Sequence, residues 1–406
     1  MRDADWVAVN KRRLVVLTRF LVEKIADRRV GIGEGHRLGL LNCRKKNSMY
    51  EIRGQWLCLG FTFTHMKKIL SIDGGGIRGI IPGRILVELE TKLQERTGNP
   101  QARVADFFDF FAGTSTGGIL TCLYLCPDKD NPAISRFSAQ EAVDLYLKKG
   151  GHIFDTTVWQ RVRSGGGVLD EKYDAEPLEK LLKRYFGDVR LSQLRKPCII
   201  PAYDIERRES HFFAQHDFAR KGPGSDFLIR DVARATSAAP TYFEAANIDS
   251  LSQVSYSLVD GGVFANNPAL CAYSEVRNAR KDPKAADMMI VSIGTGSQNR
   301  PYEYADAKNW GQIGWVRPVI DIMMAGASET TDYHLTRMFS AVNQSDQYIR
   351  LQPANLGDAS PDMDDAREKN IKALLQVGTE TAQNCHDELN RIVEILVNDG
   401  PDPVLF

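Results

Sequence analysis

Five residues of the sequence have the spacing of a serine hydrolase nucleophile. The motif Gly113-Thr114-Ser115-Thr116-Gly117 has the form G-x-S-x-G, in which the serine lies on a sharp turn between a strand and a helix. The apolar run 107–112 precedes it, and residues 118–125 follow with helix-like composition. The two glycines carry no Cβ, so the backbone can bend tightly and a substrate carbonyl can approach. The pattern predicts Ser115 as a nucleophile, although such short matches also arise by chance.

A second glycine-rich segment, Asp73-Gly74-Gly75-Gly76-Ile77-Arg78-Gly79, lies between a predicted strand and a predicted helix. Its spacing also satisfies the dinucleotide-binding pattern, which requires a second strand ending in an acidic residue about 20 residues later. Here the next predicted strand runs into the serine turn instead. Backbone N–H groups at a helix N-terminus stabilise a developing negative charge. We therefore favour an oxyanion hole formed by the amides of this loop, with the charge of Arg78 added.

The predicted base is an aspartate at the end of a strand. Asp260 closes the predicted strand 256–259 and is followed by Gly261-Gly262. A carboxylate in this position can face the carboxyl edge of the sheet, where Ser115 should also lie, and can remove the serine proton. The same residue in an ordinary turn would cap the next helix instead. The catalytic interpretation of Asp260 therefore depends on the presence of Ser115.

Histidine offers an alternative base. The triad of an α/β-hydrolase runs in the order Ser, Asp or Glu, His along the chain. His334 and His386 follow Asp260, but both lie in predicted helices and neither lies in a loop after a strand. His211 and His216 precede Asp260. A dyad without histidine is the simpler interpretation, and the triad remains open.

From residue 66 onward, short apolar strands alternate with helix-periodic segments. This alternation predicts an α/β fold, a three-layer sandwich whose mostly parallel central sheet is flanked by helices. The small-residue segment 234–243 is predicted to support the site, and 159–174 to form a flexible loop. Strands are predicted at 67–72, 107–112, 198–203, 210–213, 256–259, 288–293 and 348–351, and helices at 80–96, 139–149, 175–186, 228–237, 267–280, 316–338 and 366–396.

Composition excludes several classes of protein. The chain has 406 residues, of which 43% are hydrophobic, and equal numbers of acidic and basic residues. It is therefore expected to be globular, without a general attraction to nucleic acid. Its seven cysteines are scattered and show no zinc-ligand spacing, which predicts a reducing compartment and a cytoplasmic location. No apolar run has the length of a transmembrane helix.

Charge divides the chain near residue 66. Residues 1–65 carry seven more basic than acidic residues, and residues 66–406 carry the opposite excess. Residues 4–29 have the pattern of a basic amphipathic helix, which is consistent with a membrane-binding or partner-binding arm or with an extension outside the fold. We expect a basic N-terminal extension at 1–65, a catalytic core at 66–300, and a mostly helical C-terminal part at 301–406 packed on the core.

Taken together, the motifs resemble the patatin-like phospholipase family. The glycine loop 73–79, the serine motif 113–117, the segment 234–243 and Leu258-Val-Asp-Gly-Gly-Val-Phe-Ala-Asn-Asn-Pro268 follow the order and spacing of that family. The resemblance implies a Ser115–Asp260 dyad and an oxyanion hole from the Gly74–Arg78 loop. It also implies lipid acyl hydrolase activity without a metal or an organic cofactor. The remaining glycines of the motifs would support this site: Gly79, Gly113, Gly117, Gly261 and Gly262.

The resemblance also suggests partners. The substrate would be a phospholipid or another acyl lipid at a membrane surface, so peripheral membrane association is expected. Some bacterial relatives are switched on by cyclic nucleotides, but such an activator is implied by resemblance only. The competing interpretations are a Ser-His-Asp esterase, a nucleotide-binding protein built on Gly74–Gly79, and a catalytically silent lipid-binding or scaffold protein.

Overall fold

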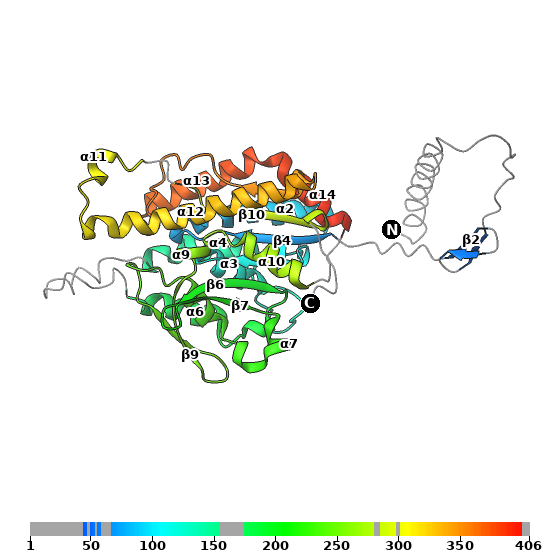
Figure 1. Cartoon of the computed structure of the whole chain (residues 1–406), viewed down its shortest axis with the longest axis horizontal. Coiled ribbons are helices and arrows are strands. Elements are labelled where there is room, and N and C mark those ends of the chain that lie inside the picture. Colours follow the sequence, from blue (N-terminus) through cyan, green and yellow to red (C-terminus); the bar gives the residue numbers. More distant parts are fainter. Residues whose placement is uncertain are drawn as a thin grey trace, which may run out of the picture. The chain divides into compact units, whose positions relative to one another are not determined.

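The computed structural model describes residues 44–46, 49–52, 55–57, 66–153, 174–279, 285–297 and 301–399 (Figure 1). The chain separates into two units, Met1–Phe63 and Thr64–Phe406. The helix expected at 4–29 and the loop expected at 159–174, except its last residue, lie outside the described residues.

The N-terminal unit contains a small antiparallel sheet that the sequence pattern did not predict. Its strands are β1 (Arg44–Lys46), β2 (Met49–Ile52) and β3 (Gln55–Leu57), paired in that order. These strands are only three or four residues long, which is too short for hydrophobic periodicity to identify them.

The second unit is built on an eight-stranded sheet with the order β11-β10-β4-β5-β6-β9-β8, and β7 pairs with β6. The first five of these strands are parallel, whereas β7, β9 and β8 run antiparallel to their neighbours. This arrangement confirms the predicted α/β fold with a mostly parallel sheet. The strands are β4 (Lys67–Ile72), β5 (Phe110–Gly113), β6 (Cys198–Asp204), β7 (Glu209–Ala214), β8 (Ala246–Asp249), β9 (Ser255–Asp260), β10 (Met288–Ile293) and β11 (Tyr348–Leu351).

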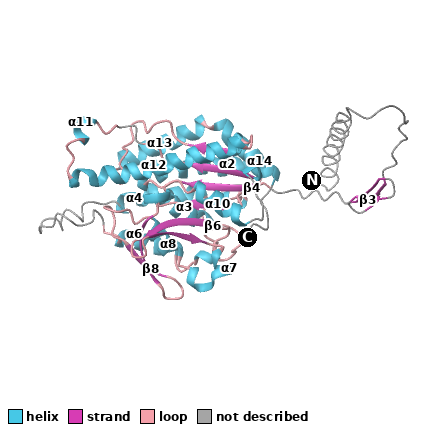
Figure 2. Ribbon diagram, viewed as in Figure 1, coloured by secondary structure: helices cyan, strands magenta, loops and turns pink. Residues whose placement is uncertain are grey.

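Helices cover both faces of this sheet (Figure 2). Successive side chains of β4 point to opposite faces, so Leu70 packs in one apolar cluster with α2, α3, α13 and α14, and Ile69 packs in another with α10 and α12. Burial on both faces explains the nearly continuous apolar strands. The helices are α2 (Ile80–Thr97), α3 (Thr116–Leu125), α4 (Ala139–Ile153), α6 (Glu176–Phe186), α7 (Asp217–Lys221), α8 (Ile229–Thr236), α9 (Gly262–Ala265), α10 (Ala269–Ala279), α11 (Tyr304–Ala307), α12 (Gln312–Ala341), α13 (Glu368–Asn384) and α14 (His386–Asp399).

The register of β6 places the ends of two other strands face to face. Residues Ile199 to Asp204 of β6 pair with β7 along one edge, so β5 and β9 must share the opposite edge. On that edge Ile199 pairs with Ala112 of β5, and Ala202 pairs with Asp260 of β9. Because β9 is antiparallel to β6 while β5 is parallel, the carboxyl ends of β5 and β9 approach each other. Ser115 and Asp260, which follow and end these strands, are thereby brought together.

Within the described residues, no helix combines the length and the apolar composition that a membrane span requires. The longest, α12, contains Pro318 in its interior, where proline removes one backbone hydrogen bond of the helix.

Candidate active site

Ser115 lies on a strained turn between β5 and α3. Its φ of 55° and ψ of −121° are rare for a residue with a side chain, and such strain is concentrated at functional sites. A Cβ on Gly117 would lie 2.1 Å from the carbonyl oxygen of Ile72, and one on Gly113 would lie 2.2 Å from that of Gly117. The turn therefore requires both glycines of the motif.

A threonine outside the serine motif stabilises this turn. The amide of Ser115 donates to Oγ1 of Thr236 at 3.0 Å, and the Thr236 hydroxyl donates to the carbonyl of Pro201 at 2.7 Å. Pro201 lies in the gap along β6 between its partners from β5 and β9. Thr236 thus joins the serine turn to β6 where backbone pairing is interrupted. It belongs to the segment 234–243, where small residues suggested structural support for the site.

Asp260 faces Ser115 in a buried environment. The serine hydroxyl donates a hydrogen bond to the Asp260 carboxylate, and the amide of Gly262 donates to its Oδ1 at 2.7 Å. Ser115 is 6% exposed and Asp260 is 2% exposed. Burial raises the pKa of Asp260 to about 7, although the hydrogen bonds from Ser115 and Gly262 act in the opposite direction. An aspartate with this pKa can both accept and return a proton near neutral pH.

The glycine loop reaches the cavity at Ser115, which Gly76 also lines, and it contains unused amides. The Gly74 amide donates to the carbonyl of Asn266 at 3.0 Å, whereas the amides of Gly75 and Gly76 donate to no group in the described part of the chain. Gly75 and Gly76 have φ values of 157° and 59°, and a Cβ on Gly76 would lie 2.1 Å from the Met363 carbonyl oxygen. The loop conformation thus depends on these two glycines.

Arg78 is buried and points away from the serine. Its guanidinium donates to the carbonyls of Gly75, at 3.4 Å, and Gly296, at 3.2 Å. It lines a polar cavity beside the loop, whereas Ser115 and Asp260 line a different, apolar one. Burial lowers the pKa of the Arg78 guanidinium. Its contacts hold the loop carbonyls in place.

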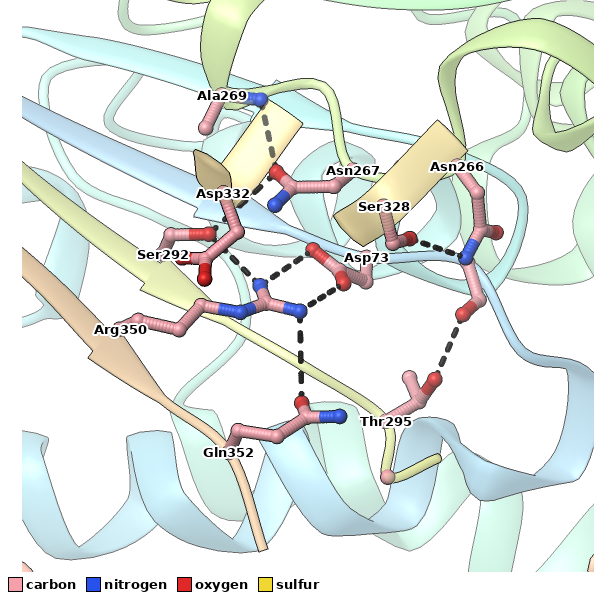
Figure 3. Close-up of polar contacts among 12 residues, drawn as sticks. Asp73, Asn266, Asn267, Ala269, Ser292, Thr295, Ser328, Asp332, Arg350 and Gln352 are labelled. Carbon is pink, nitrogen blue, oxygen red and sulfur yellow. Dashed lines mark hydrogen bonds and ion pairs between the residues drawn. The ribbon is translucent and has the colours of Figure 1, made fainter. Parts of the chain in front are cut away.

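A buried ion pair anchors the start of the loop (Figure 3). Arg350 of β11 donates to Asp73 through two nitrogens, at 2.9 and 2.5 Å, and also donates to Oγ of Ser292 at 2.8 Å. The hydroxyl of Thr295 donates to the Gly74 carbonyl at 2.7 Å. The loop is therefore attached to β10 and β11 through side chains. Sequence reasoning missed Arg350 because no local pattern distinguishes it.

The other glycines of the motifs mark close contacts between backbone segments. A Cβ on Gly79 would lie 2.1 Å from Oγ1 of Thr116, and one on Gly261 would lie 2.3 Å from the carbonyl oxygen of Pro201. One on Gly262 would lie 3.0 Å from Oδ1 of Asp260. The amide of Thr116, directly after the serine, also donates to no group in the described residues, and it was absent from the predicted site. In a serine turn this amide is a further donor for an oxyanion.

The cavity at Ser115 is almost entirely apolar. It contains about 680 Å³ of empty space, part of which opens to solvent. Its wall is formed by residues of α3, α4 and α6, by the segment 237–243 and by Met324 of α12. The wall includes Ile119, Leu145, Leu178, Leu182, Phe243 and Met324. Such a lining fits a hydrocarbon chain whose carbonyl reaches the serine.

The histidines do not complete a triad in the described structure. His334 and His386 are exposed on α12 and at the start of α14, and His386 contacts Lys92. His211 lies in an aromatic cluster with Phe213. Of the histidines whose side chains the structure describes, none lines the cavity at Ser115.

Comparison with known proteins places this chain in a family. The sequence profile of the family described as Patatin-like phospholipase matches residues 70–273. The chain is 36% identical over 339 residues to Patatin-like protein 2 of Oryza sativa subsp. japonica, with 77% of this chain and 83% of that protein covered. It is 36% identical over 330 residues to Patatin group D-2 of Solanum tuberosum, with the same shares covered.

Two solved structures are also similar, each at 12% identity. VipD from Legionella pneumophila matches with a TM-score of 0.33 over 89% of this chain and 73% of that chain. Human GIVD cytosolic phospholipase A2 in complex with methyl gamma-linolenyl fluorophosphonate matches with a TM-score of 0.34 over 83% and 59%. The family assignment rests on the profile and on the plant relatives. The chain belongs to the patatin-like phospholipase family, which confirms the expected enzyme class, a lipid acyl hydrolase.

Proposed function

We propose that this chain hydrolyses fatty acyl esters of membrane lipids, in the manner of a phospholipase A, through a Ser115–Asp260 dyad. The observation that carries the proposal is the hydrogen bond from Ser115 to the buried Asp260 beside the apolar cavity. A strained serine, a base matched to neutral pH and unused amides are the parts that acyl transfer requires.

In the proposed acylation step, Asp260 accepts the Ser115 proton as Oγ attacks the ester carbonyl carbon. The carbonyl oxygen becomes an oxyanion held by the amides of Gly75 and Gly76, with that of Thr116 as a third donor. When the intermediate collapses, the leaving alcohol takes the proton from Asp260 and the acyl group remains on Ser115. The Gly74 amide and the Arg78 guanidinium act on the loop itself, because both are engaged with backbone carbonyls.

In the proposed deacylation step, Asp260 takes a proton from water, and the resulting hydroxide attacks the acyl carbon. Ser115 leaves, regains the proton from Asp260, and the fatty acid departs. The acyl chain would occupy the cavity between α4, α6 and α12 in both steps. We also propose that the chain is cytoplasmic and associates peripherally with membranes. A cyclic-nucleotide activator stays a prediction with no residue attached to it.

The proposal can be tested on the full chain. A fluorophosphonate probe should modify one serine, and peptide mass analysis should place the adduct on Ser115. Sonicated vesicles of phosphatidylcholine should release free fatty acid, and prior labelling should abolish that release. Labelling without hydrolysis of any ester, or hydrolysis that survives stoichiometric labelling of Ser115, would contradict the dyad.

Activity should depend on pH through the ionisation of Asp260. The base must be deprotonated, and its pKa is raised to about 7 by burial. We expect kcat/KM for a soluble ester to fall about tenfold per pH unit below this value and to level off above it. The measurement is a pH profile with p-nitrophenyl butyrate between pH 5 and 9, a range chosen to bracket the raised pKa. A profile that stays flat down to pH 5 would argue against Asp260 as the base.

Arg350 should position the glycine loop 73–79. Removing it leaves Asp73 buried without its partner, so the glycine loop should shift. We expect Arg350→Gln to lower kcat for a soluble ester by about 10²-fold, the effect of a small misplacement in an active site, with little change in KM. Arg350→Lys should recover only part of this, since lysine cannot form the paired hydrogen bonds.

Arg391→Gln is the control for this prediction, because Arg391 forms an exposed ion pair with Asp346. Fluorophosphonate titration should give the concentration of intact sites in each variant. A loss of activity in Arg350→Gln that only follows a loss of titratable sites would assign Arg350 to stability and not to positioning.

A further inference from the structure

The first half of α12 exposes an apolar face. Trp315, Val316, Val319, Ile322 and Met323 are each between 41% and 47% exposed. Their spacing of one, four, seven and eight residues from Trp315 places them on one side of the helix. Contiguous exposed apolar surface of this kind marks a site of interaction with a partner or a membrane. We call these five residues the apolar face of α12.

Aromatic residues extend the apolar face toward α11. Tyr302 and Trp310 lie 5.2 Å apart edge to face, and Trp310 and Trp315 lie 5.0 Å apart in the same arrangement. The Tyr302 hydroxyl donates to Asp321 at 3.0 Å, which ties this segment to α12. Tyr304 is 80% exposed. Tyrosine and tryptophan side chains are enriched where a protein meets the headgroup region of a bilayer.

The apolar face adjoins the catalytic cavity. Met324 follows Met323 along the helix, but its side chain is buried and lines the cavity together with Ser115 and Asp260. Helix α12 also packs on α9, which begins two residues after Asp260. In Figure 1, α11 and the start of α12 lie at the same side of the molecule as α9. One helix thus contributes to the wall of the cavity and to the exposed surface next to it.

Charge argues against an electrostatic contact. Between residues 301 and 323 the sequence contains three acidic and two basic residues, so the segment that carries the apolar face has almost no net charge of its own. A partner held by charge would require one sign to dominate. Insertion of apolar and aromatic side chains into the interfacial layer of a bilayer has no such requirement.

We propose that the apolar face of α12, with Tyr302 and Tyr304, docks on the surface of a lipid bilayer and places the mouth of the catalytic cavity against it. This inference rests on the proposed function, because an acyl lipid must leave the bilayer to reach Ser115. Docking on this face lets the acyl chain pass along Met324 into the apolar cavity without crossing bulk water.

The test compares two double variants that remove similar exposed side chains. Trp315→Ser with Ile322→Ser removes side chains that are 42% and 47% exposed, and Phe218→Ser with Ile134→Ser removes side chains that are 40% and 48% exposed. Ile134 follows α3, which leads away from Ser115, and Phe218 lies beyond β7, which runs antiparallel to β6. The control pair therefore lies away from the carboxyl edge of the sheet.

Binding is measured by sedimentation of the full chain with phosphatidylcholine vesicles in 0.15 M salt, where the Debye length is about 8 Å. The uncharged lipid and the salt suppress any contribution from the basic segment 1–65. Each protein carries Ser115→Ala so that the vesicles stay intact. We expect the α12 pair, Trp315→Ser with Ile322→Ser, to bind at least about tenfold more weakly than the parent, because burial of one large apolar side chain is worth that factor. The control pair should bind like the parent.

When Ser115 is restored, both double variants should hydrolyse p-nitrophenyl butyrate at the parental rate. A parental rate on this soluble ester shows that the variants fold. Only the α12 pair should lose hydrolysis of vesicle lipid. Equal vesicle binding by all proteins, or no binding by the parent, would overturn the proposal. So would a parental dimer in analytical ultracentrifugation that the α12 pair converts to a monomer, since the face would then bind a second copy. Loss of vesicle binding in the α12 pair, with no ester hydrolysed by the parent, would support docking and reject the proposed chemistry.

Discussion

Ser115→Ala is expected to reduce the hydrolysis of both vesicle lipid and soluble esters by about 10⁴- to 10⁶-fold, the range found when a catalytic nucleophile is removed. The change deletes one hydroxyl from a buried position and leaves the glycines of the turn in place. The deleted oxygen is the proposed nucleophile, so no acyl-enzyme can form, and its hydrogen bond to Asp260 is lost with it. The measurement is fatty acid release, together with the loss of fluorophosphonate labelling.

Histidine variants are the controls for this prediction. His334→Ala and His386→Ala should keep the parental rate, because both side chains are exposed and neither lines the cavity. A collapse of activity in either variant would favour the Ser-His-Asp alternative. Retention of normal activity by Ser115→Ala would reject every mechanism that uses this serine.

Asp260→Asn is expected to lower kcat by about 10⁴-fold, comparable to the loss when the carboxylate of a catalytic triad becomes an amide. Asparagine keeps the shape of the side chain but cannot accept the proton of Ser115. Fluorophosphonate labelling should slow in parallel, because the same proton transfer activates the serine. The measurement is single-turnover release of p-nitrophenol, which isolates the acylation step.

The same variant should be more stable at neutral pH. The pKa of Asp260 is raised in the folded protein, so the folded state binds the proton more tightly than the unfolded state does. The stability from this group is complete below the unfolded pKa and is lost as pH rises through about 7. Asparagine stays neutral, so Asp260→Asn should melt at a higher temperature than the parent at pH 8 and at a similar temperature at pH 4. A lower melting temperature at pH 8 would show that burial does not penalise the charged carboxylate.

Much of the fold could be predicted because the strands are buried on both faces. The strand β10 is a nearly continuous apolar run, β4 carries the apolar residues Ile69, Leu70 and Ile72, and both stand out against the periodic helices. The edge strand β8 was missed because only two of its four residues are buried. The segment 366–396 was predicted to be helical throughout, and the structure divides it at Cys385 into α13 and α14.

The residues that support the site were harder to predict than those that would perform the chemistry. Arg350 has no distinctive local pattern. Thr236 lies in the small-residue segment 234–243 and Thr116 in the serine motif, but neither pattern shows what these residues do at the site. Thr236 contacts the Ser115 amide across 121 positions of the chain, and Arg350 contacts Asp73 across 277. Such contacts depend on how strands are ordered in the sheet, which short-range spacing does not encode.

The sequence by itself determined the candidate nucleophile, the candidate base and the glycine loop. Each lies in a short motif whose glycines determine the local backbone conformation, so a few adjacent residues are enough to identify it. The tertiary structure decided which loop amides remain unused, how deeply Asp260 is buried and which side chains line the apolar cavity. These properties arise from the meeting of β5 and β9 along one edge of β6 and from the packing of α12 beside the serine. Burial, and the raised pKa of Asp260 that follows from it, exists only when distant segments enclose the carboxylate.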